Sequence, residues 1–339
     1  MDDWLKNNLV CPRDLNKLQR SDNDLVCSAG CNYPIIDGIP IMLLEEVFPT
    51  HLSHTLSTLA KVSASRMSSQ FIHISKEFQE KPGIEILEKD GIHPYVQKAI
   101  AATCGRLYKP VVGKLTRYPI PEIRLPQGSG EIFLDIGSNW GRWSIAAAKK
   151  GYNPVGIDPS LDALLAARQI SRQLNMSARY IVADARYLPF ASSCFDVVFS
   201  YSVLQHFSKE NARQTLTSVS RVLKPKGTCL IQMPNTYGLH NLYNQVRRAF
   251  SEFKQFDVRF WNLRELRDTF TEIIGPTSLF VDGYFGLGIQ KSDIDLLPLK
   301  YRLVVHASEI LRMMSEKIQW MKYFADSIYV KSIRELEVE

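Results

Sequence analysis

The chain has 339 residues, a formal net charge of +6 and a pI of about 8.9. Hydrophobic residues make up 45% and charged residues 22%, which is ordinary for a soluble globular protein of about two domains. The start, MDDWLKNNLV, lacks the basic region and long apolar core of a signal peptide, and no run of 18 uncharged apolar residues follows. Six cysteines are too few for a disulfide framework here. We therefore expect a cytoplasmic enzyme, whose mild positive charge permits contact with RNA or anionic lipid.

Three cysteines lie together in residues 1–47, a segment that we expect to form a small ribbon-like β module. Cys11 precedes a proline, and Cys27 and Cys31 flank Gly30. Thiolates on two such tight turns are typical of the knuckles of a zinc ribbon, which hold one tetrahedral ion. Asp14 stands where a fourth thiolate would be expected. The predicted metal ligands are therefore Cys11, Asp14, Cys27 and Cys31, with an unusual oxygen ligand.

The same segment resembles the small zinc-ribbon subunit that partners tRNA and release-factor methyltransferases, above all in YPIIDGIPIML at residues 33–43. Its knuckle spacing is also similar to that of the ribbon that opens the large-subunit rRNA guanine-N1 methyltransferases. The resemblance implies one structural Zn²⁺. The alternative is a ribbon that has lost its metal and is held by apolar packing of Tyr33, Ile35, Ile36, Ile39 and Ile41.

Residues 48–125 differ in composition and read as a helical linker or cap. Serine and threonine are frequent from Thr50 to Ser69, and a helix is expected from Pro94 to about Tyr108. Pro126 and the Gly-Ser-Gly run at 128–130 then read as an extended connection into the next domain.

Residues 132–151 read as strand, glycine turn and helix. The apolar run Ile132–Ile136 suits a strand buried on both faces, and a helix should follow Gly141 and end near Gly151. Gly137 lets a ligand approach the backbone closely, and the start of the helix offers free amide donors. The stretch therefore predicts a site for a nucleotide-like ligand.

The turn itself reads Asp135-x-Gly137-x-x-x-Gly141, which is not the dinucleotide pattern G-x-G-x-x-G. An acid at this place suits a ligand with a cationic amino group. Here the sequence resembles the class I S-adenosylmethionine-dependent methyltransferases, whose first motif is D-x-G-x-G-x-G; the middle glycine is replaced by Asn139, a residue tolerant of positive φ. The resemblance implies that the amino-acid end of the cofactor is held by Asp135, Gly137, Ser138, Asn139 and Gly141.

Strands and helices alternate from residue 132 onward. We therefore expect residues 126–339 to form a Rossmann-like α/β domain with a seven-stranded, mostly parallel sheet and helices on both faces. The second strand, 154–158, ends in Asp158, which is placed to accept from the ribose hydroxyls. Its alternative role is to cap the helix expected at 160–174. In methyltransferases of this class, helices before the first strand often cover the substrate; a plain linker is the alternative for residues 48–125.

Two further strand ends carry candidate residues. The third strand ends at Asp184, which with Ala185 resembles the adenine-binding motif of the family. The fourth, 195–200, should bring Ser200 and Tyr201 toward the cofactor's methyl group, with Gln205 as another lining residue. His206 is the candidate general base; the alternative is a structural histidine at a helix start.

The C-terminal part contains an expected helical insertion at about 236–270, followed by the sixth strand at 277–286 and the seventh at 324–333. The insertion could meet RNA, a phosphorylated or glycosylated acceptor, or a lipid headgroup; the alternative is an amphipathic helix pair with a solvated basic face. Its basic and aromatic residues are Tyr243, Arg247, Arg248, Phe250, Phe253, Lys254, Phe256, Arg259, Phe260, Trp261, Arg264 and Arg267. A helix at 301–321 has one apolar side, which packs on the sheet or lies on a membrane.

The motifs together cover about 200 residues and look closest to the branch with the ubiquinone and menaquinone biosynthesis methyltransferases. The first hypothesis is a methyltransferase that uses S-adenosylmethionine and acts on a small, lipid-like or glycosylated metabolite by in-line transfer. The second is an rRNA or tRNA base methyltransferase. A third, from another class, is a non-catalytic cofactor-binding partner subunit, motivated by Asn139 and the missing fourth thiolate.

Overall fold

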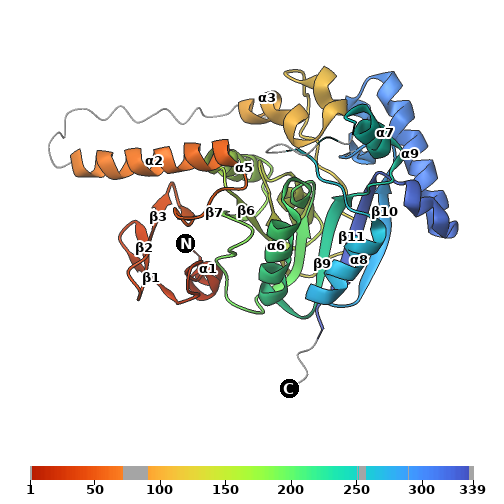
Figure 1. Cartoon of the computed structure of the whole chain (residues 1–339). Coiled ribbons are helices and arrows are strands. Elements are labelled where there is room, and N and C mark those ends of the chain that lie inside the picture. Colours follow the sequence, from red (N-terminus) through yellow and green to blue (C-terminus); the bar gives the residue numbers. More distant parts are fainter. Residues whose placement is uncertain (1, 72–90, 250, 252–256, 289, 336–339) are drawn as a thin grey trace.

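A computed structural model describes residues 2–71, 91–249, 251, 257–288 and 290–335 (Figure 1). Its centre is one sheet with the strand order β1-β2-β3-β4-β7-β6-β5-β8-β9-β11-β10. None of the helices in these residues is both long enough and apolar enough to cross a bilayer.

The seven strands expected after residue 131 are all present, and five of them run parallel. The parallel strands are buried on both faces, as their apolar runs predict: β5 (Ile132–Ile136), β6 (Asn153–Asp158), β7 (Arg179–Ala183), β8 (Phe195–Ser200) and β9 (Leu223–Pro234). The last strand, β11 (Ser327–Ile333), runs antiparallel between β9 and β10 (Thr277–Gly283).

The sheet has eleven strands instead of the expected seven, because the four strands of the N-terminal module continue it. The module contains α1 (Asp3–Asn8), β1 (Leu18–Ser21), β2 (Asp24–Cys27), β3 (Asn32–Ile36) and β4 (Ile39–Met42). Its last strand pairs in parallel with β7, at Ile41 with Val182 and Met42 with Ala183. An edge strand of a parallel sheet would otherwise present unpaired backbone groups, so the module covers that edge. The whole sheet is consequently mixed, with antiparallel pairs at both ends.

Helices cover both faces of the parallel region. On one face α6 (Lys209–Val222) contacts α8 (Leu263–Ile273), and both lie in front of the sheet in Figure 1. The other helices that follow the parallel strands are α4 (Arg142–Lys149) and α5 (Leu161–Gln173), and α5 also contacts α2 (Leu52–Phe71). Ser160 caps α5 by accepting from the amide of Ala163, so this helix has almost the expected bounds.

The remaining helical segments are α3 (Pro94–Thr103), η1 (Arg106–Val111), η2 (Leu204–His206), α7 (Leu239–Arg247), η3 (Lys291–Leu296), α9 (Leu299–Lys317) and η4 (Gln319–Phe324). The helix expected to reach Tyr108 ends at Thr103, because Gly105 has a φ of 105°. The expected insertion at 236–270 contains α7 and most of α8, with buried Trp261 between them in the sequence. Phe250, Phe253, Lys254 and Phe256 of that segment lie outside the described residues.

Candidate functional site

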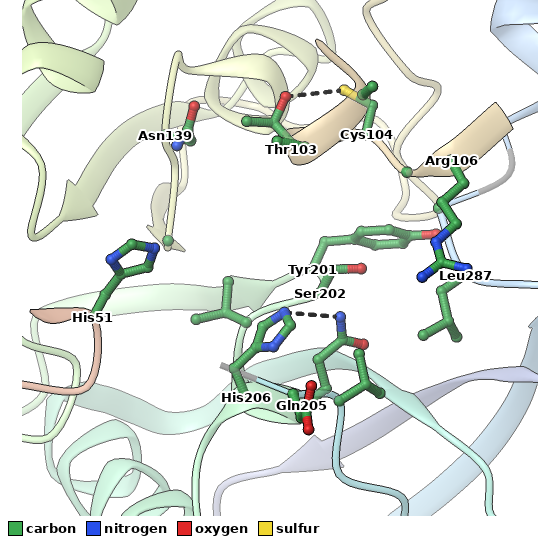
Figure 2. Close-up of a pocket in the computed structure, with 18 of the residues that line it drawn as sticks. His51, Thr103, Cys104, Arg106, Asn139, Tyr201, Ser202, Gln205, His206 and Leu287 are labelled. Carbon is green, nitrogen blue, oxygen red and sulfur yellow. Dashed lines mark hydrogen bonds between the residues drawn. The ribbon is translucent and has the colours of Figure 1, made fainter. Parts of the chain in front are cut away.

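A cavity of about 1270 Å³ lies beyond the carboxyl ends of the parallel strands. Gly137, Asp158, Asp184 and Tyr201 line it, and each follows or ends one strand, where ligands of open α/β sheets bind. Segments α3, η1 and α7 and residues 285–288 also line the cavity. Figure 2 shows His206 and Gln205 across this space from Thr103 and Cys104. The residues expected as a linker therefore contribute to the wall of the site.

The glycine turn after β5 has the backbone shape that the sequence predicts. Gly137 and Asn139 have φ values of 74° and 46°, so asparagine adopts the left-handed conformation at the place of a glycine. The amides of Gly137 and Ser138 donate to the carbonyl of Ile157, at 2.8 and 2.9 Å. The turn is thus fastened to β6, and Gly137 and Asn139 face the cavity as lining residues.

Asp158 ends β6, and the cap of α5 is Ser160 rather than Asp158. One carboxylate oxygen accepts from the amide of Ser160 at 2.9 Å and the other from the amide of Asn139 at 3.1 Å. The residue also lines the cavity. Burial raises its pKa to about 6, although the hydrogen bonds from Ser160 and Asn139 oppose this shift. The carboxyl of Asp158 therefore changes charge near neutral pH.

Asp135 lies outside the cavity lining, against the expectation of a direct ligand. Its carboxylate accepts from the hydroxyl of Ser144 on α4 at 2.7 Å, beneath the turn, and only 1% of the residue is exposed. Burial raises its pKa to about 7. In this structure, Asp135 joins β5 to α4.

Three other predicted cofactor residues also lie outside the lining. Ser200 is fully buried, and its hydroxyl donates to the carbonyl of Ile136 at 3.1 Å. Ser138 is buried, and its hydroxyl has no partner among the described residues. Gly141 starts α4, and the Tyr180 hydroxyl lies 2.5 Å from the place of an added Cβ. These three residues are therefore packed inside the fold around the turn and do not line the cavity.

Asp184 and Ala185 both line the cavity, and the sequence reasoning missed the partner of the acid. Arg186 donates to the Asp184 carboxylate from Nε at 3.0 Å and from Nη2 at 2.7 Å. The same guanidinium donates to the carbonyl of Phe48 at 2.7 Å. Asp184 and Arg186 are two residues apart in a loop, where no repeating sequence pattern indicates a contact. The family motif therefore predicted the acid but not its arginine partner.

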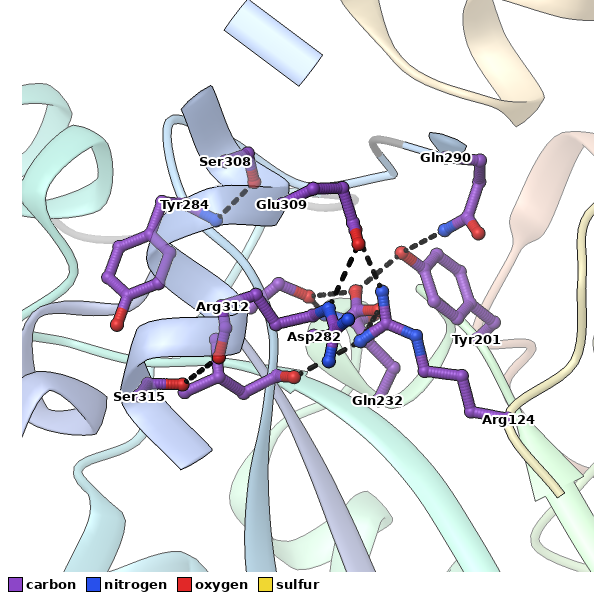
Figure 3. A network of polar contacts seen from close by, with 12 residues as sticks. Arg124, Tyr201, Gln232, Asp282, Tyr284, Gln290, Ser308, Glu309, Arg312 and Ser315 are labelled. Carbon is purple, nitrogen blue, oxygen red and sulfur yellow. Dashed lines mark hydrogen bonds and ion pairs between the residues drawn. The ribbon is translucent and has the colours of Figure 1, made fainter. Parts of the chain in front are cut away.

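Tyr201 lines the cavity and belongs to a buried polar network, shown in Figure 3. Its hydroxyl donates to Asp282 at 2.7 Å and accepts from Gln290 at 2.9 Å. Burial raises its pKa well above the usual value, so the phenol stays neutral. Arg124 lies 3.7 Å from the other Asp282 oxygen and 3.2 Å from Glu309 on α9. The network therefore connects the cavity wall to α9.

His206 ends η2 and lines the cavity, with one ring nitrogen 3.2 Å from the side-chain nitrogen of Gln205. The sequence did not indicate two of the cations that share this lining, Arg106 and Arg142, whereas Arg247 belongs to the basic and aromatic set predicted to meet an acceptor. Arg142 is 5% exposed and pairs with buried Asp293. Arg106 and Arg247 make no ion pair among the described residues, and Arg106 lies on a segment with no recognisable motif.

A second cluster lies in the N-terminal module. One ligand atom from each of Cys11, Asp14, Cys27 and Cys31 lies within 4.8 Å of all the others. Zn–S bonds of about 2.3 Å place tetrahedral ligands roughly 4 Å apart, so a small contraction would suit one zinc ion. Cys11 and Cys27 are buried, and Cys11 contacts the Tyr33 hydroxyl at 3.2 Å. The three thiols and one carboxylate thus fit one Zn²⁺.

Residues 133–227 match the family Methyltransf_25, a methyltransferase domain. Uncharacterized protein MJ1252 of Methanocaldococcus jannaschii is 27% identical over 245 residues, which are 66% of this chain and 90% of that protein. The ubiquinone/menaquinone biosynthesis C-methyltransferase UbiE of Blochmanniella pennsylvanica is 44% identical over 68 residues, 19% of this chain and only 26% of UbiE. A UPF0434 protein of Vesicomyosocius okutanii is 47% identical over 47 residues, 14% of this chain and 80% of that protein.

Proposed function

The chain contains a class I S-adenosylmethionine-dependent methyltransferase domain and a stretch that belongs to the UPF0434 family; on this basis, we propose that it methylates a single small or lipid-like molecule. The observation that carries the proposal is the cavity of about 1270 Å³, which is walled by helices as well as by strand ends. Ligand pockets are commonly about 300–1,000 Å³, so the space suits a cofactor and one acceptor. A folded RNA would need an open basic face instead.

The lining residues fit the cofactor by their donor chemistry. S-adenosylmethionine supplies an activated methyl group on a sulfonium. We assign the ribose hydroxyls to Asp158, the adenine to Asp184 with Ala185, and the amino-acid end to the backbone at Gly137 and Asn139. Their places at neighbouring strand ends support this assignment.

His206 is the proposed proton acceptor when the acceptor group is a hydroxyl. Its place in η2, which follows β8 and lines the cavity, supports this role. Methyl transfer to an amine that is already neutral would need only alignment. Replacement of His206 by Gln should therefore lower the rate with a hydroxyl acceptor and leave cofactor affinity unchanged.

Cofactor affinity should depend on pH through Asp158. Because burial raises its pKa to about 6, only about a tenth of the folded protein carries the carboxylate at pH 5. Hydroxyl donors bind a carboxylate better than a carboxylic acid, so the affinity should rise about tenfold between pH 5 and pH 8. Calorimetric titrations across this range measure the slope. Asp158→Asn is the matched variant and should bind weakly without that rise; the same rise in this variant would exclude Asp158 as its source.

We also propose that Cys11, Asp14, Cys27 and Cys31 hold one structural zinc ion. The mutual approach of their ligand atoms supports this proposal. The purified protein should contain about one zinc per chain by elemental analysis. Cys27→Ser should lose most of it, whereas Cys194→Ser, at a buried cysteine outside the cluster, should keep it. Equal metal content in both variants would contradict the site.

The acceptor class is tested with cofactor carrying a labelled methyl group. The protein is incubated separately with total lipid extract, polar metabolites and total RNA. Label in the lipid or metabolite fraction, lost on replacement of Asp158 by Ala, is the expected result. Label in RNA alone would replace this proposal with the base-methyltransferase alternative.

A further inference from the structure

Helix α9 buries two serines and leaves most of its large apolar residues exposed. Its fully buried residues are Val305, Ser308 and Ser315, which are 0%, 1% and 6% exposed. The hydroxyl of Ser308 accepts from the amide of Tyr284 at 2.9 Å, so the polar side is used inside the fold. A helix on the surface of a globular protein normally buries its apolar stripe and exposes polar residues. This helix instead buries two serines beside Val305 and leaves most of its large apolar residues exposed.

The exposed side of α9 carries a stripe of large apolar residues at helical spacing. Leu299, Leu303 and Ile310 are 73%, 63% and 54% exposed, and Met313 and Met314 continue the stripe at 51% and 43%. The sequence left open whether the apolar side of this helix packs on the sheet. In the structure most of that side is exposed, so the sheet does not cover it.

The neighbouring segments repeat the pattern. On α7, Asn241 is buried and bonded to the carbonyls of Asn235 and Asp326, while Tyr243 and Val246 are 60% and 58% exposed. On η4, Trp320 is 63% exposed. An apolar groove of about 580 Å³ is lined by Tyr237, Leu239, Leu242, Tyr243, Val246, Tyr323 and Phe324, and thus joins α7 to η4. We call the exposed apolar residues of α7, α9 and η4 the apolar end; Figure 1 shows α7 and α9 far from the N-terminal module.

The charges around the apolar end have one predominant sign. Residues 298–324 contain five Lys or Arg residues and two acids. Both acids are in ion pairs: the carboxylates of Glu309 and Glu316 lie 3.0 and 2.6 Å from the guanidinium of Arg312. Lys300, Lys317 and Lys322 have no carboxylate partner in the part of the chain that the structure describes. A second copy of the chain would bring the same excess of positive charge to a symmetric contact, which is unfavourable.

We propose that the apolar end docks on the surface of an anionic lipid bilayer. Exposed Trp and Tyr suit the boundary between headgroups and acyl chains, and aliphatic side chains with flanking lysines suit an interfacial helix on anionic lipid. Helix α7 connects this surface with the cavity: His240, Asn244 and Arg247 line the cavity, and Tyr243 and Val246 line the groove. A bilayer at this end would present its lipids beside the cavity.

Vesicle co-sedimentation of the full chain tests the proposal. The vesicles are phosphatidylcholine alone and phosphatidylcholine mixed with phosphatidylglycerol. Binding should be strong only to the mixed vesicles and should weaken as salt is raised. Trp320→Ser combined with Leu303→Ser should weaken that binding at least about tenfold, because each change removes one buried apolar side chain from the contact.

The matched control is Phe48→Ser, a change at an apolar residue that is 79% exposed on the N-terminal side. Its vesicle binding should equal that of the unaltered chain. Thermal unfolding and cofactor titration of each variant separate loss of docking from loss of fold or of the methyltransferase site. Equal losses in the control, or no binding to mixed vesicles, would overturn the proposal. A dimer that the Trp320/Leu303 variant dissolves, without vesicle binding, would assign the surface to a second copy.

Discussion

Replacement of Gly137 by alanine should abolish measurable cofactor binding and lower the free energy of unfolding by about 2–5 kcal/mol. The added Cβ would lie 2.2 Å from Cγ2 of Val203 and 3.2 Å from its Cβ. Val203 is β-branched and has little rotameric freedom, so the turn itself must shift. The φ of 74° adds backbone strain for any side chain. Calorimetric titration and denaturant unfolding measure the two effects.

Gly113→Ala is the control for backbone strain alone. Its φ is 71°, and an added Cβ would meet nothing within 4 Å. This variant should lose only about 1 kcal/mol and keep its cofactor affinity. Combining Gly137→Ala with Val203→Ala should recover part of the loss, since the crowding methyl groups are gone. Equal behaviour of the two alanine variants would show that crowding at Val203 is unimportant.

Replacement of Phe190 by alanine should lower the free energy of unfolding by about 3–5 kcal/mol. Phe190 is fully buried, and its ring lies 6.2 Å from that of Trp4 and 4.9 Å from that of Phe195. Its backbone also forms a bridge with Leu9. The change should therefore destabilise the N-terminal module together with the sheet, in one cooperative transition.

Differential scanning calorimetry and denaturant titration test this result. Phe48→Ala should stay within about 0.5 kcal/mol of the unaltered chain, because that side chain is 79% exposed. Two separate transitions in the Phe190 variant, with only the first shifted, would mean that the module and the sheet fold independently.

The parallel strands could be predicted because each is encoded locally. Ile132–Ile136 and Phe195–Ser200 are apolar runs of strand length, and the structure has the same bounds for both. The left-handed turn at Asn139 was likewise predictable, because few residues other than glycine tolerate positive φ. The apolar character of these strands and the tolerance of asparagine for positive φ are properties of single residues, so they can be read directly from the sequence.

Relations between distant segments could not be predicted in this way. The pairing of Ile41 with Val182 joins residues far apart in the sequence, and neither strand specifies its neighbour. The periodicity of α9 predicted an apolar side but not that the side would face outward, because the buried serines Ser308 and Ser315 look polar in the sequence. The motif likewise gives the position of Asp135 in the turn but not its hydrogen bond to Ser144 on the next helix.

Calorimetric titration with S-adenosylmethionine and its demethylated product, on the unaltered chain and on Asp158→Ala, tests the account most directly. We expect micromolar binding of both compounds to the unaltered chain and a loss of at least about a hundredfold in the variant, because Asp158 lines the cavity and its carboxylate also accepts from the amide of Asn139 in the turn. Equal affinity in the two proteins would contradict the assignment of the pocket. No binding to a folded, unaltered chain would favour a partner subunit over an enzyme.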